Sequence, residues 1–467
     1  MRLCWLCVCL CWRWKMSFVD KFLGFFFPKK PLEPGIHHFI GRGPFEGTRF
    51  HIRIEKGGKA ILIINAARIL HLNSTAAEYA LAILSGKSSE EVVKYIRSRY
   101  RVGKATAIND EKKMRELLVN LVKNPDVCPV SYYNVQMVEP FTTPLSAPYR
   151  MDIALTYRCN NKCVHCYVGE RKKQELSVEE WKRVIEKLYK AGIPHIVFTG
   201  GEPTLYEGLE KLIAHAEKLG IVTGLNTNGR KLKDRAYLQK LVDAGLDHVQ
   251  ITVESSDREI HNKMTGSDAF DETIEGLKNC LDTRLYTMTN TTITKLNKDT
   301  IEDTVRFLHS LGLKNFACNG LIYSGSAKGC EIGLDEKELL EPVLKAKTLA
   351  ISLGMRFIWY TPTQYCNLNP LTYGLGAKQC SAAKSNMCIE PDGEVIPCQS
   401  YFQSAGNILK EPWEKIWYAP LCRKIRAREY APAKCRNCPD FSVCGAGCPL
   451  YLQHASTVCL SPTGGAT

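Results

Sequence analysis

Residues 154–167 read ALTYRCNNKCVHCY, in which a short apolar run, typical of a buried strand, leads directly into three closely spaced cysteines. Cys159, Cys163 and Cys166 have the spacing C-x3-C-x2-C. Three thiolates on one loop can bind three irons of a four-iron cluster and leave the fourth iron without a protein ligand. A structural zinc ion, by contrast, normally takes four protein ligands. An iron with an open position can bind a substrate, so this spacing indicates chemistry rather than a structural site.

A second motif follows one strand later, where residues 199–203 read TGGEP after the apolar run 195–199. In a parallel barrel the carboxyl ends of all strands share one face, and active sites form there. We therefore expect the GGEP backbone to lie beside the cysteine loop. Paired glycines allow a ligand to approach the backbone closely.

Strand and helix patterns alternate from Arg150 onward. The apolar runs predict six strands, at 151–156, 195–199, 221–226, 248–253, 285–293 and 315–321. Helical patterns lie between them, at 177–191, 207–219, 234–244, 268–280 and 298–312. This alternation predicts an α/β fold with a parallel sheet, either doubly wound or a partial barrel. A further helix over 336–353 precedes a cysteine-rich tail.

The cysteine loop and the GGEP motif together resemble the radical S-adenosylmethionine (SAM) enzymes over about residues 150–321. The resemblance implies a partial (β/α)6 barrel and an iron that chelates the amino and carboxylate groups of SAM. It places the GGEP residues at the methionine amino group. These residues are Gly200, Gly201, Glu202 and Pro203. The alternative is a zinc-binding loop beside an ordinary turn.

The same resemblance suggests the other SAM contacts. His165 occupies the family's usually aromatic position before the third cysteine, near the adenine, although a plain loop residue would also suit this place. Polar residues at the strand ends are candidates for the ribose and carboxylate of SAM. They are Asn226, Thr252, Glu254 and Asn290. A role in a turn or a helix cap is equally compatible with each of them.

The tail contains seven more closely spaced cysteines, with the motifs PDGEVIPC and CGAGC. This pattern resembles the SPASM extension of radical SAM enzymes, which implies a Cys-rich domain with two auxiliary [4Fe-4S] clusters. One cluster is expected on Cys435, Cys438, Cys444 and Cys459. The other is expected on Cys380, Cys398 and Cys448, with Cys388 as the candidate fourth ligand or with one iron left open. Two zinc sites are the physical alternative.

The cysteines outside these motifs are informative about where translation starts and about whether the thiols are reduced. Residues 1–15 lack a small-residue cleavage site, and we expect translation to start at Met16. Cys4, Cys7, Cys9 and Cys11 would then not be part of the protein. Without export, the other 17 of the 21 cysteines stay reduced in the cytoplasm, which favours metal over disulfides. No apolar run reaches the roughly 18 residues of a membrane-spanning helix. Six cysteines without a motif are expected to be buried thiols: Cys128, Cys280, Cys318, Cys330, Cys366 and Cys422.

A small winged-helix-like α+β domain is predicted over residues 46–124, with three strands and then three helices. It resembles the pyrroloquinoline-quinone D-type (PqqD-like) peptide chaperones, also called recognition elements of ribosomally made, post-translationally modified peptides. This implies that the leader of a precursor peptide adds as a strand to the sheet edge. Arg49, Arg53, Lys56 and Lys59 would favour an acidic leader. A winged-helix-like domain with a different partner is the alternative. The domain shows no dense basic helix of the kind that would recognise nucleic acid. The net charge of +14 does not favour one class of partner over another.

The expected organisation follows from these parts. It comprises an N-terminal arm (1–45), the peptide-binding domain (46–124), a Pro-rich linker (125–149), the radical SAM core (150–345), a bridging segment (346–379) and the SPASM domain (380–467). The resemblances imply an enzyme that takes an electron from a low-potential donor such as ferredoxin or flavodoxin. It would cleave SAM to a 5′-deoxyadenosyl radical and modify a precursor peptide oxidatively.

Two other functions stay open. One is a radical SAM/SPASM enzyme of cofactor (haem-type) biosynthesis or of sulfatase maturation. The other is a non-catalytic iron–sulfur protein that transfers electrons or binds a peptide. The sequence does not assign a catalytic residue, and it does not choose a hydrogen donor among Tyr323, Tyr360 and Tyr365.

Overall fold

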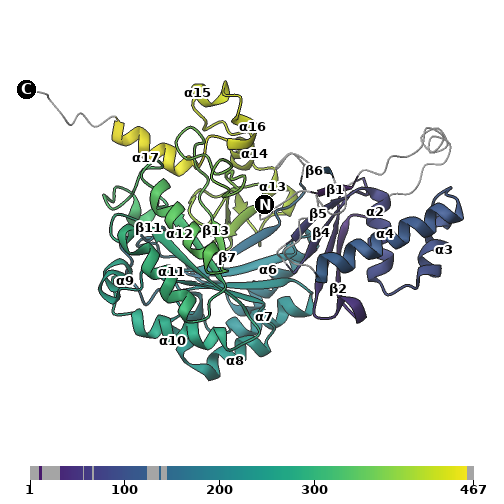
Figure 1. Ribbon diagram of the computed structural model, residues 1–467, viewed down its shortest axis with the longest axis horizontal. Helices are drawn as coiled ribbons and strands as arrows, with labels where there is room; N and C mark the ends of the chain where they lie inside the picture. The colour runs from purple at the N-terminus through teal and green to yellow at the C-terminus, as the bar shows by residue number, and fades with distance from the viewer. Residues whose placement is uncertain are drawn as a thin grey trace, which may run out of the picture. The chain divides into compact units, whose positions relative to one another are not determined.

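The computed structural model describes residues 32–55, 57–65, 68–123 and 145–459, together with two short strands at 10–12 and 136–137 (Figure 1). The chain divides into two units. The first consists of Met1–Ser146 and Leu188–Pro194, and the second of Ala147–Lys187 and His195–Thr467. Most of the Pro-rich linker predicted over 125–149 lies outside the described residues.

The first unit contains an antiparallel sheet of four consecutive strands. These are β2 (Gly35–Ile40), β3 (Arg49–Ile54), β4 (Ala60–Ile64) and β5 (Arg68–Leu72). Gly57 and Gly58, with φ of 92° and 81°, form the turn between β3 and β4, as the sequence predicted. The strand β2 lies within the stretch that was expected to be an arm, because its sequence GIHHFI shows no clear alternation of apolar and polar residues.

Two short strands extend this sheet at the β5 edge. The strand β1 (Leu10–Trp12) pairs in parallel with β5, and β6 (Gln136–Met137) pairs antiparallel with β1. The β2 edge ends the sheet within the described part of the chain. The edge strand β5 therefore takes up an additional strand from a distant part of the sequence.

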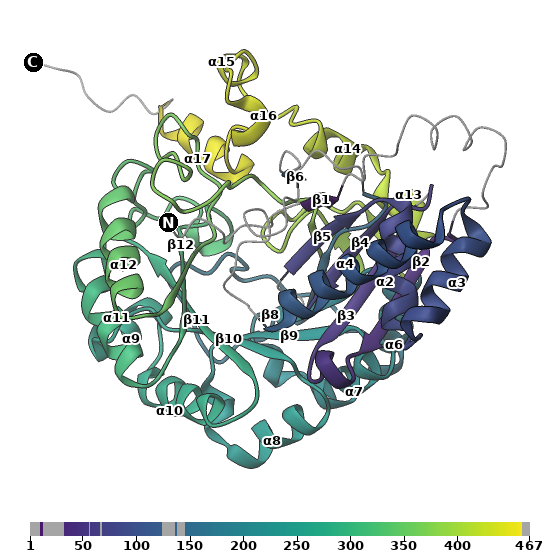
Figure 2. The same cartoon turned by 45° about the vertical axis from the view of Figure 1, so that its right-hand side comes forward.

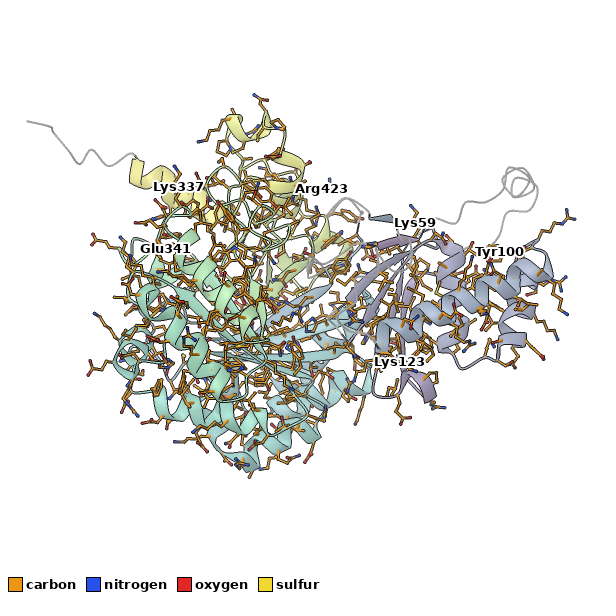
Figure 3. The ribbon with its side chains drawn as sticks, in the orientation of Figure 1. Lys59, Tyr100, Lys123, Lys337, Glu341 and Arg423 are labelled. Carbon is orange, nitrogen blue, oxygen red and sulfur yellow. The ribbon has the colours of Figure 1, made fainter. Side chains whose placement is uncertain are left out.

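Three helices cover one face of this sheet (Figure 2). They are α2 (Ser74–Leu84), α3 (Ser89–Arg99) and α4 (Lys104–Lys123), as the sequence predicted. The side chain of Asn73 caps α2, and Ser88 with Glu91 forms a capping box on α3. Tyr100, labelled in Figure 3, lies at the end of α3. Its hydroxyl donates a hydrogen bond of 2.8 Å to the buried carboxylate of Glu78 on α2. These contacts join the helices into one layer.

The second unit is built on a largely parallel sheet. The six expected strands are β7 (Arg150–Thr156), β8 (His195–Gly200), β9 (Val222–Thr227), β10 (His248–Thr252), β11 (Tyr286–Ile293) and β12 (Asn315–Gly320), and they pair in this order, all parallel. The partial (β/α)6 barrel is therefore confirmed. Two further parallel strands flank it, β13 (Arg356–Trp359) beside β12 and β14 (Asn386–Ile389) beside β7.

Helices between the strands cover the outer face of the sheet (Figures 1 and 2). The expected ones are α6 (Val178–Lys190), α7 (Leu209–Lys218), α8 (Arg235–Asp243), α10 (Phe270–Leu281), α11 (Ile301–Ser310) and α12 (Leu340–Ser352). A short helix, α9 (Arg258–Thr265), was not predicted. Apolar side chains of these helices are buried, among them Trp181 on α6 and Leu212 on α7.

The tail continues the sheet and ends in short helices. The strands β15 (Glu394–Ile396) and β16 (Gly406–Asn407) add antiparallel to β14. The helices are α13 (Trp413–Trp417), α14 (Pro420–Arg426), α15 (Ala433–Arg436), α16 (Phe441–Cys444) and α17 (Pro449–Cys459). In the part of the chain that the structure describes, no helix has the length and apolar character needed to cross a membrane.

Candidate functional site

The cysteine loop leaves the carboxyl end of β7 and lies directly against the GGEP turn. The amide of Gly201 donates to Thr156 O at 2.8 Å, and the amide of Glu202 donates to Arg158 O at 2.8 Å. These bonds continue the pairing of β7 with β8 up to the residue before Cys159. The expectation that the two motifs are neighbours is therefore confirmed.

The two glycines of GGEP are required by this contact between backbones. Gly200 has a φ of +130°, and a Cβ atom placed on it would lie 2.1 Å from Thr156 O. A Cβ atom on Gly201 would lie 2.4 Å from Arg158 O. The paired glycines were expected to allow close approach of a ligand, whereas the structure shows that the approach of the cysteine loop itself already excludes any side chain here.

The opposite side of the cysteine loop is fixed by backbone hydrogen bonds. Lys162 and Val164 donate to the carbonyls of Thr265 and Met264, at 2.9 and 3.0 Å. The carbonyl of Cys166 accepts a hydrogen bond of 2.8 Å from the amide of Ser326. The three cysteines are thus held on a loop whose shape is set by several parts of the unit.

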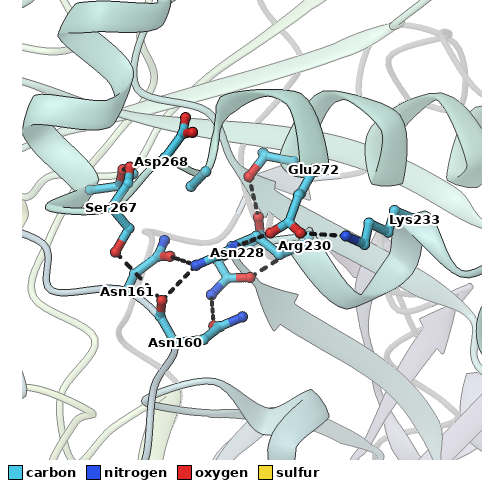
Figure 4. A network of polar contacts seen from close by, with 12 residues as sticks. Asn160, Asn161, Asn228, Arg230, Lys233, Ser267, Asp268 and Glu272 are labelled. Carbon is cyan, nitrogen blue, oxygen red and sulfur yellow. Dashed lines mark hydrogen bonds and ion pairs between the residues drawn. The ribbon is translucent and has the colours of Figure 1, made fainter.

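A polar network fixes the first half of the loop (Figure 4). Arg230 donates to Asn160 O at 2.6 Å and to Asn161 Oδ1 at 2.9 Å, while its Nε donates to Glu272 at 2.5 Å. Asn228 also donates, to Asn160 Oδ1 at 2.6 Å. Arg230 was not predicted from the sequence, although it directly follows residues 226–229 (the NTNG segment) at the end of the third barrel strand.

Glu202 points into the protein. Its carboxylate accepts four hydrogen bonds, from the amide and hydroxyl of Thr204, the hydroxyl of Thr227 and the amide of Asn228, at 2.7 to 3.0 Å. Burial raises the pKa of this carboxyl, although the hydrogen bonds oppose the shift. The Glu202 side chain thus joins the GGEP turn to the NTNG segment.

A cavity of about 1440 Å³ opens at the carboxyl ends of the barrel strands. Its lining includes Cys159, Cys163 and Cys166 and most of the predicted SAM contacts. These contacts are His165, Gly200, Gly201, Asn226, Thr252, Glu254 and Asn290. Glu202 and Pro203 are not in the lining, and SAM binding by all nine residues stays a prediction. Asn319, at the end of the sixth strand, also lines the cavity. It was not predicted, although it is a polar residue at a strand end like the other candidates for SAM contacts.

Several buried polar atoms at this cavity have no protein partner among the described residues. They are Nδ1 of His165, Oδ1 of Asn290 and Oε1 of Gln399. The other ring nitrogen of His165, Nε2, lies 2.9 Å from Glu254 Oε1. Buried polar atoms normally have a hydrogen-bond partner, so they fit a ligand rich in donors and acceptors, as the amino, ribose and adenine groups of SAM are.

The three thiols of the loop suit an iron–sulfur cluster. Burial raises the pKa of the Cys163 thiol well above its ordinary value, so a thiolate here suits a site in which a bound metal compensates its charge. No group of three or more His, Cys, Asp or Glu among the described residues is arranged to hold a single metal ion. In a four-iron cluster each thiolate binds a different iron, and the thiolates do not converge on one point.

The tail cysteines form two groups. In the first auxiliary group, Cys380 lies within electrostatic reach of both Cys398 and Cys448. Burial raises the pKa of Cys398 to about 12. Cys388 is buried on β14, packs with Ala154 and lies within electrostatic reach of Cys398. Its role as fourth ligand stays a prediction.

The second auxiliary group consists of Cys435, Cys438 and Cys444. The thiol of Cys444 is within electrostatic reach of Cys435 and also of Cys366. The side chain of Cys459, which was predicted to complete this group, is outside the described residues.

The cysteines without a motif differ in burial. Cys280, Cys318 and Cys422 are fully buried, as expected. Cys330 is only half-buried and Cys366 is exposed, so the expectation of a buried thiol is wrong for both. The cause is that each lies in a loop rather than on a buried helix or strand face. Cys128 lies outside the described residues.

The tyrosines considered as hydrogen donors do not line the cavity. Tyr323 stacks on His454 with ring centroids 3.8 Å apart. The hydroxyl of Tyr360 contacts Met288 Sδ at 3.8 Å, and that of Tyr365 hydrogen-bonds the backbone of Lys378. Two other tyrosines, Tyr157 and Tyr167, line the cavity, and the sequence gave no signal for them.

Comparison with known proteins identifies two domains. Residues 153–308 match the radical SAM superfamily, and residues 380–439 match the SPASM iron-sulfur cluster-binding domain. The Fe-coproporphyrin III synthase of Methanosarcina barkeri is 30% identical over 291 residues, which cover 56% of this chain and 72% of the relative. The mycofactocin maturase MftC of Mycolicibacterium smegmatis is 27% identical over 329 residues, which cover 67% of this chain and 81% of that protein.

Solved structures share the fold. SuiB of Streptococcus suis bound to the precursor peptide SuiA aligns with a TM-score of 0.67 at 18% identity, over 89% of this chain and 97% of SuiB. The protein anSMEcpe with bound AdoMet and a peptide aligns with a TM-score of 0.53 at 18% identity, over 65% of this chain and 89% of that chain. The chain therefore belongs to the radical SAM superfamily, and it is a radical SAM/SPASM enzyme whose cofactors are [4Fe-4S] clusters and SAM.

Proposed function

We propose that the enzyme modifies a ribosomally made precursor peptide. When bound, the reduced cluster at Cys159, Cys163 and Cys166 supplies the electron that cleaves SAM into methionine and a 5′-deoxyadenosyl radical able to abstract hydrogen from an unactivated carbon. The electron would come from a low-potential donor such as ferredoxin or flavodoxin in the cytoplasm. The protein binds and orients the reactants and excludes water.

The architecture of the first unit supports a peptide as the substrate. Three strands (β3 to β5) followed by three helices are the arrangement expected of a PqqD-like element over residues 46–124, and β2 adds a fourth strand to the same sheet from residues before this range. Its β5 edge pairs with the added strand β1, which shows the kind of main-chain pairing that a leader peptide would use. The proposal depends mainly on this arrangement of sheet and helices, whose β5 edge is able to pair with a further strand.

The charges expected to attract an acidic leader need revision. Arg53 is only 1% exposed and pairs with Glu55 at 2.8 Å, so it does not contribute to a positive surface. Lys56 lies outside the described residues. Of the four basic residues considered, Lys59 is exposed and Arg49 is half-buried. Selectivity for a leader would therefore depend mainly on strand pairing.

The residues of the cavity have distinct tasks in this proposal. Glu202 holds the GGEP turn in place, and the pair of His165 and Glu254 orients an aromatic ring at the cavity wall. Gln399, which directly follows Cys398, reaches the same cavity. The SPASM region therefore contributes to the space in which SAM and substrate would meet, close to the first auxiliary group.

A second candidate is the modification of a tetrapyrrole. It is favoured by the 30% identity with Fe-coproporphyrin III synthase. The cavity also contains basic side chains that suit the carboxylates of such a molecule, Arg171 and Lys172. The arrangement of the first unit favours the peptide, because a tetrapyrrole needs no sheet edge.

The two candidates can be separated with the reconstituted full-length enzyme, reduced under anaerobic conditions. The probes are the peptides encoded by small reading frames beside the gene and, in parallel, coproporphyrin. We expect formation of 5′-deoxyadenosine together with a mass change of a peptide. In the chain that starts at Met16, which lacks β1, we also expect protection of the β5 amides from hydrogen exchange when that peptide binds. A mass change of coproporphyrin alone, with no protection at β5, would refute the peptide proposal.

The chain that starts at Met16 provides a matched comparison. It lacks β1, so the β5 edge should accept the peptide more readily, and the peptide affinity should rise. Deletion of residues 46–124 should weaken peptide binding but leave unproductive SAM cleavage in place. Equal peptide affinity in all three proteins would argue against strand addition.

A further inference from the structure

The CGAGC loop (residues 444–448) joins the two auxiliary groups. Its first cysteine, Cys444, ends α16 and belongs to the second group, whereas its last, Cys448, belongs to the first. The three residues between them all have a positive φ, of 66° to 74°, and one of these is Ala446. A residue with a side chain rarely adopts this conformation, so contacts from outside the loop have to hold its shape.

Arg428 supplies one of these contacts. Its Nη1 donates to the carbonyl of Phe441 at 2.7 Å and to that of Ser442 at 3.4 Å, on the helix that ends at Cys444. Gly445 lies directly against the guanidinium, because a Cβ atom on Gly445 would be 3.1 Å from Arg428 Cζ. The positive charge of Arg428 is therefore held beside the residue that follows Cys444.

The same charge also lies beside the first auxiliary group. Arg428 and Cys380 line one small cavity of about 10 Å³, together with Tyr430. Gln379, the neighbour of Cys380 in the sequence, donates at 2.9 Å to the carbonyl of Ser442, which Arg428 also contacts. A single cation is therefore placed beside both auxiliary groups.

Tyr430 holds the loop from a second position. Its hydroxyl donates to the carbonyls of Gly445 and Gly447, at 3.2 and 3.5 Å. Both carbonyls lie in the segment between Cys444 and Cys448. Arg428 and Tyr430, two residues apart in the sequence, thus fix the loop on which the two groups meet.

The surroundings of Arg428 lack a carboxylate that would neutralise it. In the described part of the chain, the acceptors of its hydrogen bonds are backbone carbonyls. Burial lowers the pKa of Arg428, whereas Tyr430, Cys444 and Cys380 lie within electrostatic reach and act in the opposite direction. A guanidinium nevertheless stays charged in proteins. Since cations away from water are normally paired with anions, this one suits two clusters that carry the negative charge of their thiolate ligands.

We infer that Arg428 raises the reduction potential of both auxiliary clusters. Reduction adds a negative charge to a cluster, and a cation held nearby stabilises the reduced state more than the oxidised state. Both clusters then accept an electron more readily, as the proposed function requires of them. The inference rests on the auxiliary clusters of the proposed function but not on the identity of the substrate.

Redox titration followed by electron paramagnetic resonance (EPR) tests the inference in the full-length chain. The background is C159A/C163A/C166A, which lacks the cluster of the barrel and should retain about 8 irons after anaerobic reconstitution. Arg428→Gln removes the charge but keeps a hydrogen-bond donor. It should shift both equilibria about tenfold against reduction, which is about 59 mV for a one-electron couple. Arg428→Lys keeps the charge and should stay within about threefold of the background.

Three further variants assign the potentials and control for an unspecific effect of charge. Cys435→Ala should retain only the first auxiliary cluster, and Cys380→Ala only the second, so that each potential can be assigned to its group. Arg423→Gln is the matched control, because Arg423, labelled in Figure 3, is an exposed arginine on α14. Both potentials should be unchanged in it.

The inference is overturned if Arg428→Gln retains the iron with unchanged potentials, or if only one of the two clusters responds. It is also overturned if Arg428→Lys shifts the potentials as far as Arg428→Gln does, since the hydrogen bonds and not the charge would then matter. Loss of iron from Arg428→Gln would indicate a role in holding the clusters and overturns the inference as well. A failure of the peptide proposal would leave all these potentials unchanged, so the two failures are distinguishable.

Discussion

His165 Nε2 lies 2.9 Å from Glu254 Oε1, and this pair joins the cysteine loop to the end of the fourth barrel strand. The Glu254 side chain is fully buried, and its other oxygen accepts a bond of 2.8 Å from the amide of Thr292. The ring of His165 is therefore held in one orientation at the cavity wall, with Nδ1 left for a ligand.

This relationship predicts different results for two substitutions of His165. His165→Ala removes both the ring and the partner of Glu254, and we expect the dissociation constant for SAM to rise about tenfold, which corresponds to about 1.4 kcal/mol. His165→Phe keeps an aromatic ring and should bind SAM within about threefold of the wild type. Both should lower the free energy of unfolding by about 1–3 kcal/mol, because a buried acceptor loses its partner. Equilibrium dialysis and denaturant titration measure the two quantities. Equal SAM affinity of His165→Ala and the wild type would contradict a contact of this ring with SAM.

Gly200→Ala should abolish SAM cleavage. The added Cβ would lie 2.1 Å from Thr156 O at a φ of +130°, so the turn and the cysteine loop could not both keep their places. We expect a loss of more than about a hundredfold in 5′-deoxyadenosine formation, since small displacements of reacting groups have effects of this size. Gly312→Ala is the matched control, because Gly312 has a φ of +90° but open space around it. It should cost only about 1 kcal/mol of stability and keep full cleavage. Similar activities of the two variants would argue against the steric explanation.

Glu202→Gln tests the link between the GGEP turn and the NTNG segment. An amide cannot accept all four hydrogen bonds, and the amide of Asn228 would face a donor instead of Oε2. We expect a loss of about 1–3 kcal/mol in unfolding free energy and weaker SAM binding, measured by denaturant titration and by dialysis. Glu207→Gln, at an exposed position in the same segment, should change neither. An unaltered stability of Glu202→Gln would show that the buried carboxylate does not hold the turn.

Substitutions in the barrel cluster and in an auxiliary cluster should affect SAM cleavage and product formation differently. Cys159→Ala should eliminate formation of 5′-deoxyadenosine, because it removes a ligand of the cluster that binds SAM. Cys444→Ala should retain some cleavage but lose the modified product, because the auxiliary clusters are proposed to accept an electron from the substrate or to bind a substrate thiolate. Chromatography of 5′-deoxyadenosine and mass spectrometry of the product provide the readouts. Continued cleavage by Cys159→Ala would refute the assignment of the active cluster.

The stability of the first unit should depend on the protonation of Asp110. Burial raises the pKa of this carboxyl on α4 to about 6 from its ordinary value of 3.8. The folded state therefore binds a proton more tightly than the unfolded state, and the stability that this group contributes falls as the pH rises from about 4 to about 6. Asp110→Asn should remove this dependence and raise the local stability at pH 7 by about 1–3 kcal/mol.

Hydrogen exchange of the α2–α4 amides in the full-length chain measures this effect. Glu116→Gln, at an exposed position of the same helix, is the control and should leave the pH profile unchanged. If the pH dependence of hydrogen exchange is the same in Asp110→Asn as in the wild type, the raised pKa of Asp110 is not its cause.

The sequence by itself determined the barrel and its cysteine loop. The alternation of strands and helices, the C-x3-C-x2-C spacing and the GGEP motif are patterns within short stretches, and local periodicity and turn chemistry encode them directly. The three strands and three helices of residues 46–124 were predictable for the same reason. The strand β2 was not, because GIHHFI has no alternation of apolar and polar residues and becomes a strand only by pairing with β3.

Only the tertiary structure decided which distant residues meet. It turned the Glu202 carboxylate inward to Thr204, Thr227 and Asn228, buried Arg53, and brought Gln399 to the cavity of the barrel. It also placed Arg428 against the CGAGC loop that joins the two auxiliary groups, although nothing in the sequence around Arg428 distinguishes it from a surface arginine. The physical reason is that such contacts depend on the return of the chain after many residues, and the packing of the whole unit, not a local pattern, sets where it returns.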